Sequence, residues 1–416
     1  MTGGCLILGW EYPPLVEGGL GRHVGRLAPA LAAHGLAVHV LTRGPSAGEE
    51  EVDGVVVHRV AEPARPDDMT RFVPWIERMA EDMLAAGIDL ARRFDFELVH
   101  GHDWLVARAA DRLASRFGCP LVMTIHATEH GRHRGWVATE PQAHIHTVEC
   151  QAVHGADRLI VCSEYMRGHL ADVFGADERR IRVIPNGVEG ASPAMAAAGS
   201  AAGAAAVRRR WPGPAGPGEA VVLLAGRLVY EKGFQLAFAA LPRLLECLGP
   251  AHLVVAGAGI HEDALRAQVD ELGLGNHVSF LGWVAPADLD ELYAAADVCL
   301  VPSIYEPFGL VALEAMARGC PCVVADTGGL REIVPHGEAG LRFTSGDPVS
   351  LAAMVELVLG DEPLRTRLVA TAREHVARFD WTAIAARTAA VYHELAGRGA
   401  ARPAVPVGPA GLGSGE

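Results

Sequence analysis

Two glutamates, Glu306 and Glu314, are separated by seven residues in the segment 302–317. Pro307 and Gly309 stand between them and are typical of a loop that opens a helix. At this spacing on one helix the two residues would lie about 12 Å apart along its axis. The two carboxyl groups of a glycosidase lie only about 5 to 9.5 Å apart. The spacing therefore argues against a hydrolytic carboxylate pair and favours separate roles for the two glutamates.

The start of this predicted helix has the chemistry of an anion site, because backbone N–H groups and the helix dipole point at whatever lies there. We predict that the backbone amides around Gly309 and Leu310 bind a phosphate. Glu306 would then lie in the loop near a sugar, and Glu314 would face a ribose. The alternative is a surface glutamate and a helix glutamate without a ligand, and the sequence alone does not reject it.

Two basic residues, Arg227 and Lys232, lie in the segment 225–234, where a predicted strand turns into a helix. A guanidinium and an ammonium at that turn could neutralise a diphosphate. The chain has 36 basic and 50 acidic residues and a formal net charge of -14, so most of its surface repels anions. Two cations at one turn are therefore informative, although two solvated surface cations are the simpler alternative.

A glycine cluster, Gly18, Gly19, Leu20 and Gly21, follows the first predicted strand and precedes a helix. Its backbone amides are expected to bind phosphate, and the alternative is a tight turn without a ligand. Valine at position 24 breaks the G-x-G-x-x-G order and disfavours a dinucleotide site. A second pattern, VAGAG at 255–259, would suit a nucleotide-dependent oxidoreductase, but a glutamate occupies its third glycine position.

The elements that must position these residues alternate between short apolar runs and amphipathic stretches, which predicts parallel sheets covered by helices. In the first half we expect a helix at 24–34 and strands at 5–8, 38–41, 97–100, 121–125 and 158–162. In the second half we expect helices at 234–248 and 287–296, and strands at 220–225, 253–256, 277–281, 298–301 and 322–325. The fold class is therefore α/β, with two doubly wound, Rossmann-like domains whose ligand-binding edges face one another across a cleft.

The length of 416 residues is typical of two domains. We expect an N-terminal domain at 1–190, a loop and linker at 191–218, a C-terminal domain at 219–380, a helix at 381–396 that crosses back to the first domain, and a disordered tail at 400–416. The acidic balance excludes nucleic acid as a partner. The sequence has no run of about 20 apolar residues and no basic leader, so we expect no membrane span and no signal peptide. The eight scattered cysteines suggest reduced thiols in the cytoplasm.

The chain resembles the retaining GT-B glycosyltransferases, which include bacterial glycogen and starch synthases. The resemblance rests on four motifs in this order: the glycine cluster, the 225–234 segment, the two glutamates and Thr327-Gly328-Gly329. The resemblance covers residues 5 to about 396. The segments GWEYPP at 9–14 and HGHDW at 100–104 are similar to the glucan-synthesising branch, in particular to short actinobacterial α-glucosyltransferases of glycogen and methylglucose polysaccharide synthesis. The resemblance implies transfer of glucose from ADP-glucose or UDP-glucose to an α-1,4-glucan, with no cofactor and no metal.

The resemblance also implies residue roles. Arg227 and Lys232 would bind the donor diphosphate, Glu306 and His126 the donor sugar, Glu314 the ribose, and Asp103 the acceptor, and further substrate contacts would come from Gly18, Gly19, Leu20, Phe308, Gly309, Leu310, Thr327, Gly328 and Gly329. Alone, His126 could be a half-buried histidine at a strand end, and Asp103 a helix N-cap. Many family members have a lysine two residues before the glycine pair, where this chain has Val16 followed by Glu17, so the donor nucleotide stays open.

A histidine cluster, His126, His130 and His133, could in principle bind zinc, but its segment is rich in glycine and arginine and is expected to be a flexible loop, so we predict no metal site. Two further classes of protein remain as alternatives. A sugar-binding protein without activity would share the fold. A glycosyltransferase using GDP-mannose or UDP-N-acetylglucosamine, with a lipid or small-molecule acceptor, would share the motifs.

Overall fold

A computed structural model describes residues 3–66, 71–190, 207 and 218–396. The chain divides into two compact units. Unit 1 comprises Met1–Val161, Arg167–Val183 and Ala385–Glu416, and unit 2 comprises Cys162–Met166 and Ile184–Ile384. The segment 191–218 and the tail, for which we predicted a linker and disorder, lie outside the described residues except for 207 and 218.

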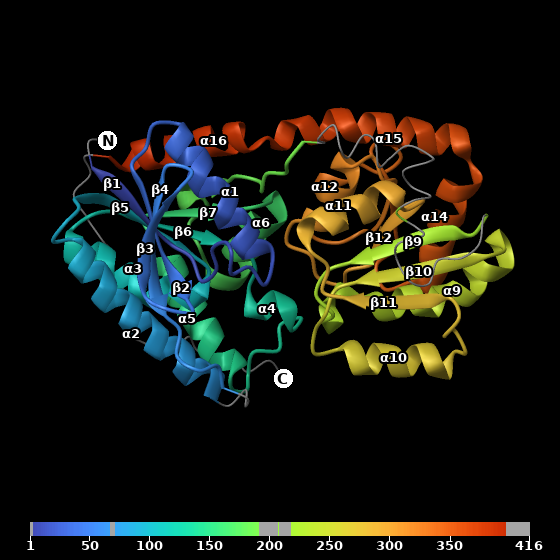
Figure 1. The fold of residues 1–416 in the computed structure, drawn as a ribbon, viewed down its shortest axis with the longest axis horizontal. Helices are drawn as coiled ribbons and strands as arrows, with labels where there is room; N and C mark the ends of the chain where they lie inside the picture. The colour runs from blue at the N-terminus through green and yellow to red at the C-terminus, as the bar shows by residue number, and fades with distance from the viewer. Residues whose placement is uncertain (1–2, 67–70, 191–206, 208–217, 397–416) are drawn as a thin grey trace. The chain divides into compact units, whose positions relative to one another are not determined.

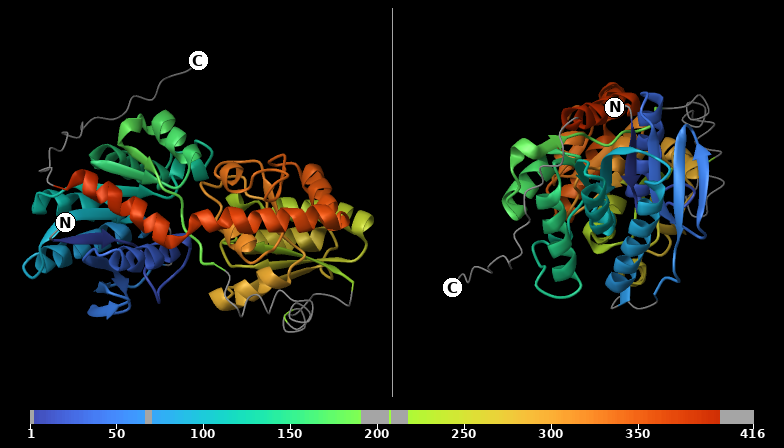
Figure 2. Two further views of the ribbon diagram at one scale, coloured as in Figure 1. Left: turned by 90° about the horizontal axis from the view of Figure 1, so that it is seen from above. Right: turned by 90° about the vertical axis from the view of Figure 1, so that its left-hand side faces the viewer.

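Unit 1 is built on an eight-stranded sheet with the order β3-β4-β2-β1-β5-β6-β7-β8. Its strands are β1 (Gly4–Leu8), β2 (Val38–Gly44), β3 (Gly48–Val52), β4 (Val55–Ala61), β5 (Phe96–His102), β6 (Leu121–Ile125), β7 (Arg158–Val161) and β8 (Ile181–Val183). All neighbouring pairs are parallel except β3 with β4, which form an antiparallel pair at one edge of the sheet (Figures 1 and 2). Every residue of β1 and β2 is buried, as in a parallel sheet covered on both faces.

The helices of unit 1 are α1 (Gly19–Ala33), α2 (Phe72–Leu90), α3 (Trp104–Phe117), α4 (Glu129–Arg132), α5 (Gln142–Gly155) and most of α6 (Glu164–Phe174), with a 3₁₀ turn, η2 (Glu178–Arg180). The last helix, α16 (Trp381–Leu395), belongs to unit 2 up to Ile384 and to unit 1 from Ala385. Its end is fixed to β5 by a hydrogen bond between the Tyr392 hydroxyl and His100 Nδ1, 2.6 Å long.

Unit 2 has a six-stranded, all-parallel sheet with the order β11-β10-β9-β12-β13-β14 (Figure 1). Its strands are β9 (Ala220–Ala225), β10 (Ala251–Ala256), β11 (Val278–Gly282), β12 (Val298–Val301), β13 (Cys322–Ala325) and β14 (Leu341–Phe343). Its helices are α9 (Phe234–Leu248), α10 (Glu262–Glu271), α11 (Pro286–Ala295), α12 (Leu310–Ala317), α13 (Leu330–Ile333), α14 (Pro348–Gly360) and α15 (Glu362–Val376), with 3₁₀ turns η3 (Tyr230–Lys232) and η4 (Ala377–Phe379).

Two local expectations were wrong. The glycine cluster is not a turn ahead of a later helix, because Gly19 to Gly21 form the first turn of α1 and only Gly18 precedes it. The segment after β6 is not an irregular loop, because Thr128 accepts a hydrogen bond from the Gly131 N–H, 3.1 Å long, and starts the short helix α4. In both places a tertiary or capping contact overrides the low helix propensity of glycine.

A buried histidine pair in unit 1 predicts how stability depends on pH. His39 Nδ1 lies 3.0 Å from His58 Nε2, and the His39 ring packs against Phe94. Burial lowers the pKa of His39 from 6.5 to about 4 and also lowers that of His58. Between pH 6.5 and 4 the unfolded chain binds protons that the folded pair does not bind. The contribution of the pair to the free energy of unfolding is therefore complete above about pH 6.5 and is lost as the pH falls toward 4.

Replacing His39 with glutamine should therefore reduce the loss of unfolding free energy between pH 7 and pH 5 by about 1–2 kcal/mol. Urea denaturation at the two pH values measures this difference. His34→Asn, at an exposed position, is the control and should keep the parental pH dependence. The same pH dependence in both variants would contradict the prediction.

Candidate functional site

An ion pair joins Lys232 and Glu306 in unit 2, with Nζ 2.6 Å from Oε2. Lys232 ends the turn η3, and Glu306 lies in the loop between β12 and α12. Glu306 is buried and also accepts a hydrogen bond from the Ser303 hydroxyl, 3.2 Å long. Lys232 is the only lysine in the sequence, all other members of the Lys plus Arg count being arginine. This position therefore carries a compact ammonium in a chain that otherwise uses guanidinium.

The two loops that carry this pair touch through their backbones. The Ile304 N–H donates to the Glu231 carbonyl at 2.8 Å. Gly233, directly after Lys232, has a φ of 70°, and a Cβ there would lie 1.9 Å from the Pro302 carbonyl oxygen. Glycine at this position is needed both for the left-handed backbone and for the close approach of the two loops.

The segment Thr327-Gly328-Gly329 supports the Glu306 loop from the other side. The Gly329 N–H donates to the Glu306 carbonyl at 2.9 Å, and the Thr327 hydroxyl donates to the Ile304 carbonyl at 3.3 Å. A Cβ on Gly328 would lie 2.1 Å from the Glu306 carbonyl oxygen. We predicted that Gly329 binds substrate, but its amide donates to the Glu306 carbonyl. In this structure Gly329 therefore positions the Glu306 loop.

The helix α12 begins where the sequence predicted an anion site. Gly309 is its N-cap with a φ of 116°, Leu310 is its first residue, and no side chain caps it. Its first backbone N–H groups therefore have no partner within the helix. The Phe308 side chain is buried, so only its backbone could face a ligand. Glu314, in the second turn, accepts a hydrogen bond from the Tyr293 hydroxyl, 3.1 Å long.

Arg227, two residues after β9, is exposed on the same side of the sheet as the other strand-end loops. Its loop is tied to the next strand-end loop by the Gly226 N–H, which donates to the Ala256 carbonyl at 3.0 Å. Unit 2 thus gathers Arg227, the Lys232–Glu306 pair and the α12 N-terminus at the carboxyl ends of its strands, where open parallel sheets bind ligands.

In unit 1, the predicted phosphate site at the glycine cluster already holds a carboxylate. Glu11 Oε2 accepts hydrogen bonds from the Glu17 N–H at 2.7 Å and the Gly18 N–H at 3.0 Å. A Cβ on Gly21 would lie 2.7 Å from the same oxygen, so glycine there permits the approach. The pKa of buried Glu11 is raised, chiefly by desolvation. The Gly18 amide is therefore occupied, while Gly19 and Leu20 lie in the first turn of α1.

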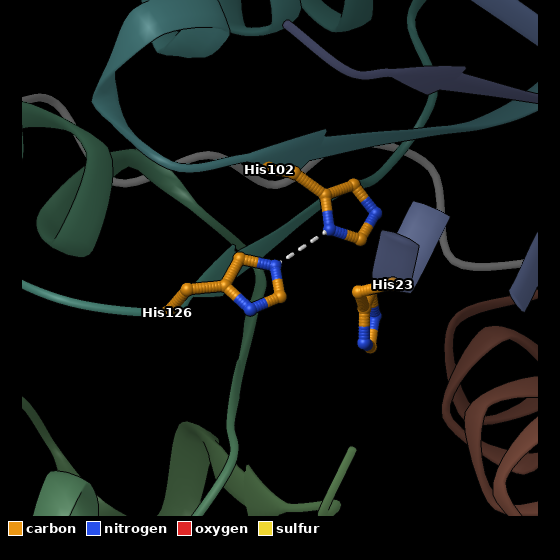
Figure 3. Close-up of side chains that lie close together, drawn as sticks. All are labelled: His23, His102 and His126. Atoms are coloured by element: carbon orange, nitrogen blue, oxygen red, sulfur yellow. Dashed lines mark hydrogen bonds between the residues drawn. The ribbon is translucent and has the colours of Figure 1, made fainter. Parts of the chain in front are cut away.

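A histidine centre lies at the carboxyl ends of β5 and β6. His102 Nδ1 is 3.1 Å from His126 Nε2, and the His23 ring of α1 lies with its centroid 4.7 Å from that of His126 (Figure 3). Burial lowers the pKa of His126 to about 4, so its imidazole is neutral at pH 7. His23 and His102 were missed by the sequence analysis; adjacent strands ending in histidine were the available signal.

Asp103 follows β5 and is buried beside this centre. Its Oδ1 accepts a hydrogen bond from the His126 backbone N–H, 2.7 Å long, and its own φ is 61°. Asp103 is the N-cap residue of α3, as the alternative interpretation had it, but its carboxylate makes no capping hydrogen bond to that helix. Burial raises the pKa of Asp103 to about 6, partly offset by the charge of Arg132.

The histidine cluster predicted from the sequence is not assembled. His130 packs instead against the rings of His146 and His169, with centroid distances of 6.0 and 5.6 Å. His133 pairs with Glu129, its Nε2 3.1 Å from Oε1. Because α4 turns successive side chains to different sides, the three histidines face different neighbours.

Two α/β units, each with a largely parallel sheet, are the architecture of the GT-B glycosyltransferases, and solved structures of that class match this chain. Sucrose-phosphate synthase from Thermosynechococcus elongatus has this fold, with a TM-score of 0.79, 28% identity and coverage of 94% of this chain and 99% of that one. The catalytic domain of starch synthase IV from Arabidopsis thaliana, bound to ADP and acarbose, superposes with a TM-score of 0.77 at 19% identity, covering 96% and 100% of the two chains.

Sequence comparison identifies the family. Residues 17–190 match the model described as glycosyltransferase family 4, and residues 208–375 match glycosyl transferases group 1. Glycogen synthase of Mycobacterium tuberculosis is 40% identical over 93% of this chain and 94% of its own length. D-inositol 3-phosphate glycosyltransferase of Acidothermus cellulolyticus is 34% identical over 88% and 83%. The chain belongs to the glycogen synthase-like family of glycosyltransferases and is a hexosyltransferase that uses a sugar-nucleotide donor.

The oxidoreductase and binding-protein alternatives are not supported by these relatives. Within the described ranges, none of the helices combines the length and the hydropathy that crossing a bilayer requires.

Proposed function

We propose that this protein transfers glucose from ADP-glucose or UDP-glucose to an α-1,4-glucan, with retention of the anomeric configuration. The observation that carries the proposal is the ion pair between Lys232 and the buried Glu306 at the strand ends of unit 2, in a chain 40% identical to a glycogen synthase over nearly its whole length. The ion pair would offer a cation and a carboxylate to a charged sugar donor, and the identity to a glycogen synthase supports glucose as the sugar and a glucan as the acceptor.

Charge on the leaving group determines how unit 2 would act. When the bond between the sugar C1 and the diphosphate oxygen breaks, negative charge grows on the β-phosphate. Lys232, Arg227 and the first amides of α12 would stabilise that charge more in the transition state than in the bound donor. Glu306, held by Ser303 and Lys232, would accept hydrogen bonds from the sugar hydroxyls. Glu314 would bind the ribose, and the Gly329 amide would hold the Glu306 loop in place.

The acceptor side would be provided by unit 1. His126, neutral at pH 7, can exchange a hydrogen bond with the donor sugar without adding charge. Asp103 would bind an acceptor hydroxyl and already orients the His126 backbone. With retention, the acceptor oxygen forms its bond to C1 on the face that the diphosphate leaves, and its proton passes to the departing phosphate. In this mechanism no side chain acts as a covalent nucleophile.

A transfer assay with radiolabelled donor tests the proposal. Purified protein is offered ADP-glucose, UDP-glucose, GDP-mannose or UDP-N-acetylglucosamine, each with glycogen or maltooligosaccharide. We expect glucose incorporation from one of the glucose donors, a loss of at least about 100-fold in Glu306→Gln, and parental activity in Glu246→Gln, an exposed position on α9. Product digestion by an α-1,4-specific amylase checks the linkage. Donor binding without glucan labelling would overturn the acceptor assignment.

A second candidate is transfer to a small phosphorylated or lipid acceptor. It is favoured by the 34% identity to an inositol-phosphate glycosyltransferase and by Val16 and Glu17 in place of the family lysine. Glu17 is paired with Arg43, 2.5 Å away, so this position offers no cation to the donor. Incorporation from GDP-mannose or UDP-N-acetylglucosamine into inositol phosphate would favour this candidate. All eight cysteines are free thiols, which supports a cytoplasmic location for either activity.

A further inference from the structure

The three histidines at the strand ends of unit 1 form a compact group of nitrogen ligands. His23, His102 and His126 each offer one ring nitrogen, and these nitrogens all lie within 4.8 Å of one another. Figure 3 shows the three rings converging from α1, the end of β5 and the residue after β6. His102 is fully buried, and its Nδ1 lies 3.1 Å from His126 Nε2, so these two nitrogens already face one another.

The chemistry of the surroundings suits a metal ion. Neutral imidazole nitrogens are common ligands of transition metals in proteins. Asp103 is buried beside His126 and adds a carboxylate to the surroundings, which favours a cation over an anion.

The spacing selects the kind of metal. Two nitrogens on one tetrahedral zinc, with bonds of about 2.0–2.1 Å, lie about 3.3 Å apart, and His102 Nδ1 and His126 Nε2 are separated by 3.1 Å. At the 4.8 Å limit the third nitrogen would have to move inward by about 1.5 Å, a shift that ring rotation about χ2 can supply. Three imidazoles favour Zn²⁺, Co²⁺, Ni²⁺ or Cu²⁺ over Mg²⁺ or Ca²⁺, and they leave a fourth position open.

We propose that His23, His102 and His126 bind one Zn²⁺ or a similar transition-metal ion, and that the bound metal inhibits glycosyl transfer. The inhibition rests on the proposed function, because it follows from the role of His126 at the donor sugar. A metal on the ring withdraws the lone pair and fixes the ring orientation, so the hydrogen bond to the sugar is lost. Metal binding itself depends only on the geometry of the three histidines and does not depend on which reaction the protein catalyses.

Metal binding is tested without substrate. Protein treated with EDTA and then desalted is titrated with ZnCl₂ by calorimetry and with CoCl₂ by visible absorption, where a four-coordinate Co²⁺ site gives intense d–d bands. We expect about one equivalent at the highest-affinity site. His102→Gln should weaken that site by about 100-fold or more, since even outer-shell changes cost 10- to 100-fold. His34→Asn, exposed directly after α1, should bind as the parent does.

His23→Gln is the second variant, and circular dichroism checks that both variants fold. Weak binding that is equal in parent, His102→Gln and His23→Gln would mean that the metal sits on other histidines, and the proposal would fail. The absence of the Co²⁺ bands in the parent would overturn it as well.

Inhibition is measured in the transfer assay with and without ZnCl₂, followed by EDTA. We expect parental activity to fall at least about tenfold at saturating Zn²⁺ and to return with EDTA, while the residual activity of His102→Gln is insensitive to Zn²⁺. Full activity with the site occupied would overturn the inhibitory role. Failure of the proposed reaction would appear as no transfer in any sample, and the metal titration would still decide the site.

Discussion

Lys232→Met should lower kcat/KM for transfer by about 10²–10³-fold, the usual effect of removing one preorganised group that stabilises developing negative charge. Methionine keeps the length and the apolar stem but removes the ammonium that lies 2.6 Å from Glu306. Lys232→Arg should recover little of the loss, because a planar guanidinium replaces a compact ammonium in a site bounded by Glu306 and Ser303. Initial rates over a range of donor concentrations measure both effects.

A double-mutant cycle separates the ion pair from catalysis. Lys232→Met leaves a buried carboxylate without its cation, whereas the double variant Lys232→Met, Glu306→Gln removes both charges. The double variant should therefore regain thermal stability without regaining activity. Recovery of activity in the double variant would show that Lys232 serves only to neutralise Glu306. Because Lys232 is the only lysine, an amine-specific reagent labels it and the N-terminus alone, and donor should protect it.

Most of the strands could be predicted because each is marked by a short apolar run in its own sequence. The apolar runs that became β6, β9, β12 and β13 were identified with their observed limits, as was the helix α9. The strands β3, β4, β8 and β14 were not predicted. For β3 the reason is that its sequence GEEEV is exposed throughout and carries no apolar pattern. Its pairing with β4 depends on contacts such as the ion pairs of Arg59 with Glu50 and Arg93 with Glu49, which no local rule reveals.

The candidate site was predictable as a set of residues but not as an arrangement. Lys232 and Glu306 were each identified from their residue types at strand ends. Their ion pair was not predicted, because the two residues lie 74 positions apart in the sequence. The sequence analysis used Glu11 only as part of the segment that resembles a known family. In the structure its carboxylate accepts the hydrogen bond of the Gly18 amide, which we had expected to bind phosphate. The histidine centre joins residues from three elements, so it appears only when the sheet register sets β5 beside β6.

Gly233→Ala should be a severely damaging change for a single added methyl group. A φ of 70° costs an alanine roughly 1–2 kcal/mol, and the added Cβ would lie 1.9 Å from the Pro302 carbonyl oxygen. Backbone on both sides must move apart, which shifts Lys232 relative to Glu306. We expect a lower melting temperature and a loss of kcat/KM of about 10²-fold, the effect of displacing a catalytic group by about 1 Å.

Gly273→Ala is the matched control for this change. Its φ of 67° is nearly the same, but nothing lies within 4 Å of the added Cβ. It should cost only the conformational term of about 1–2 kcal/mol and leave kcat/KM at the parental value. Thermal unfolding and initial rates of the two variants, measured side by side, isolate the contact with Pro302. If the two variants lose equal stability and equal activity, the close approach of the loops does not position Lys232, and only the left-handed backbone of Gly233 matters.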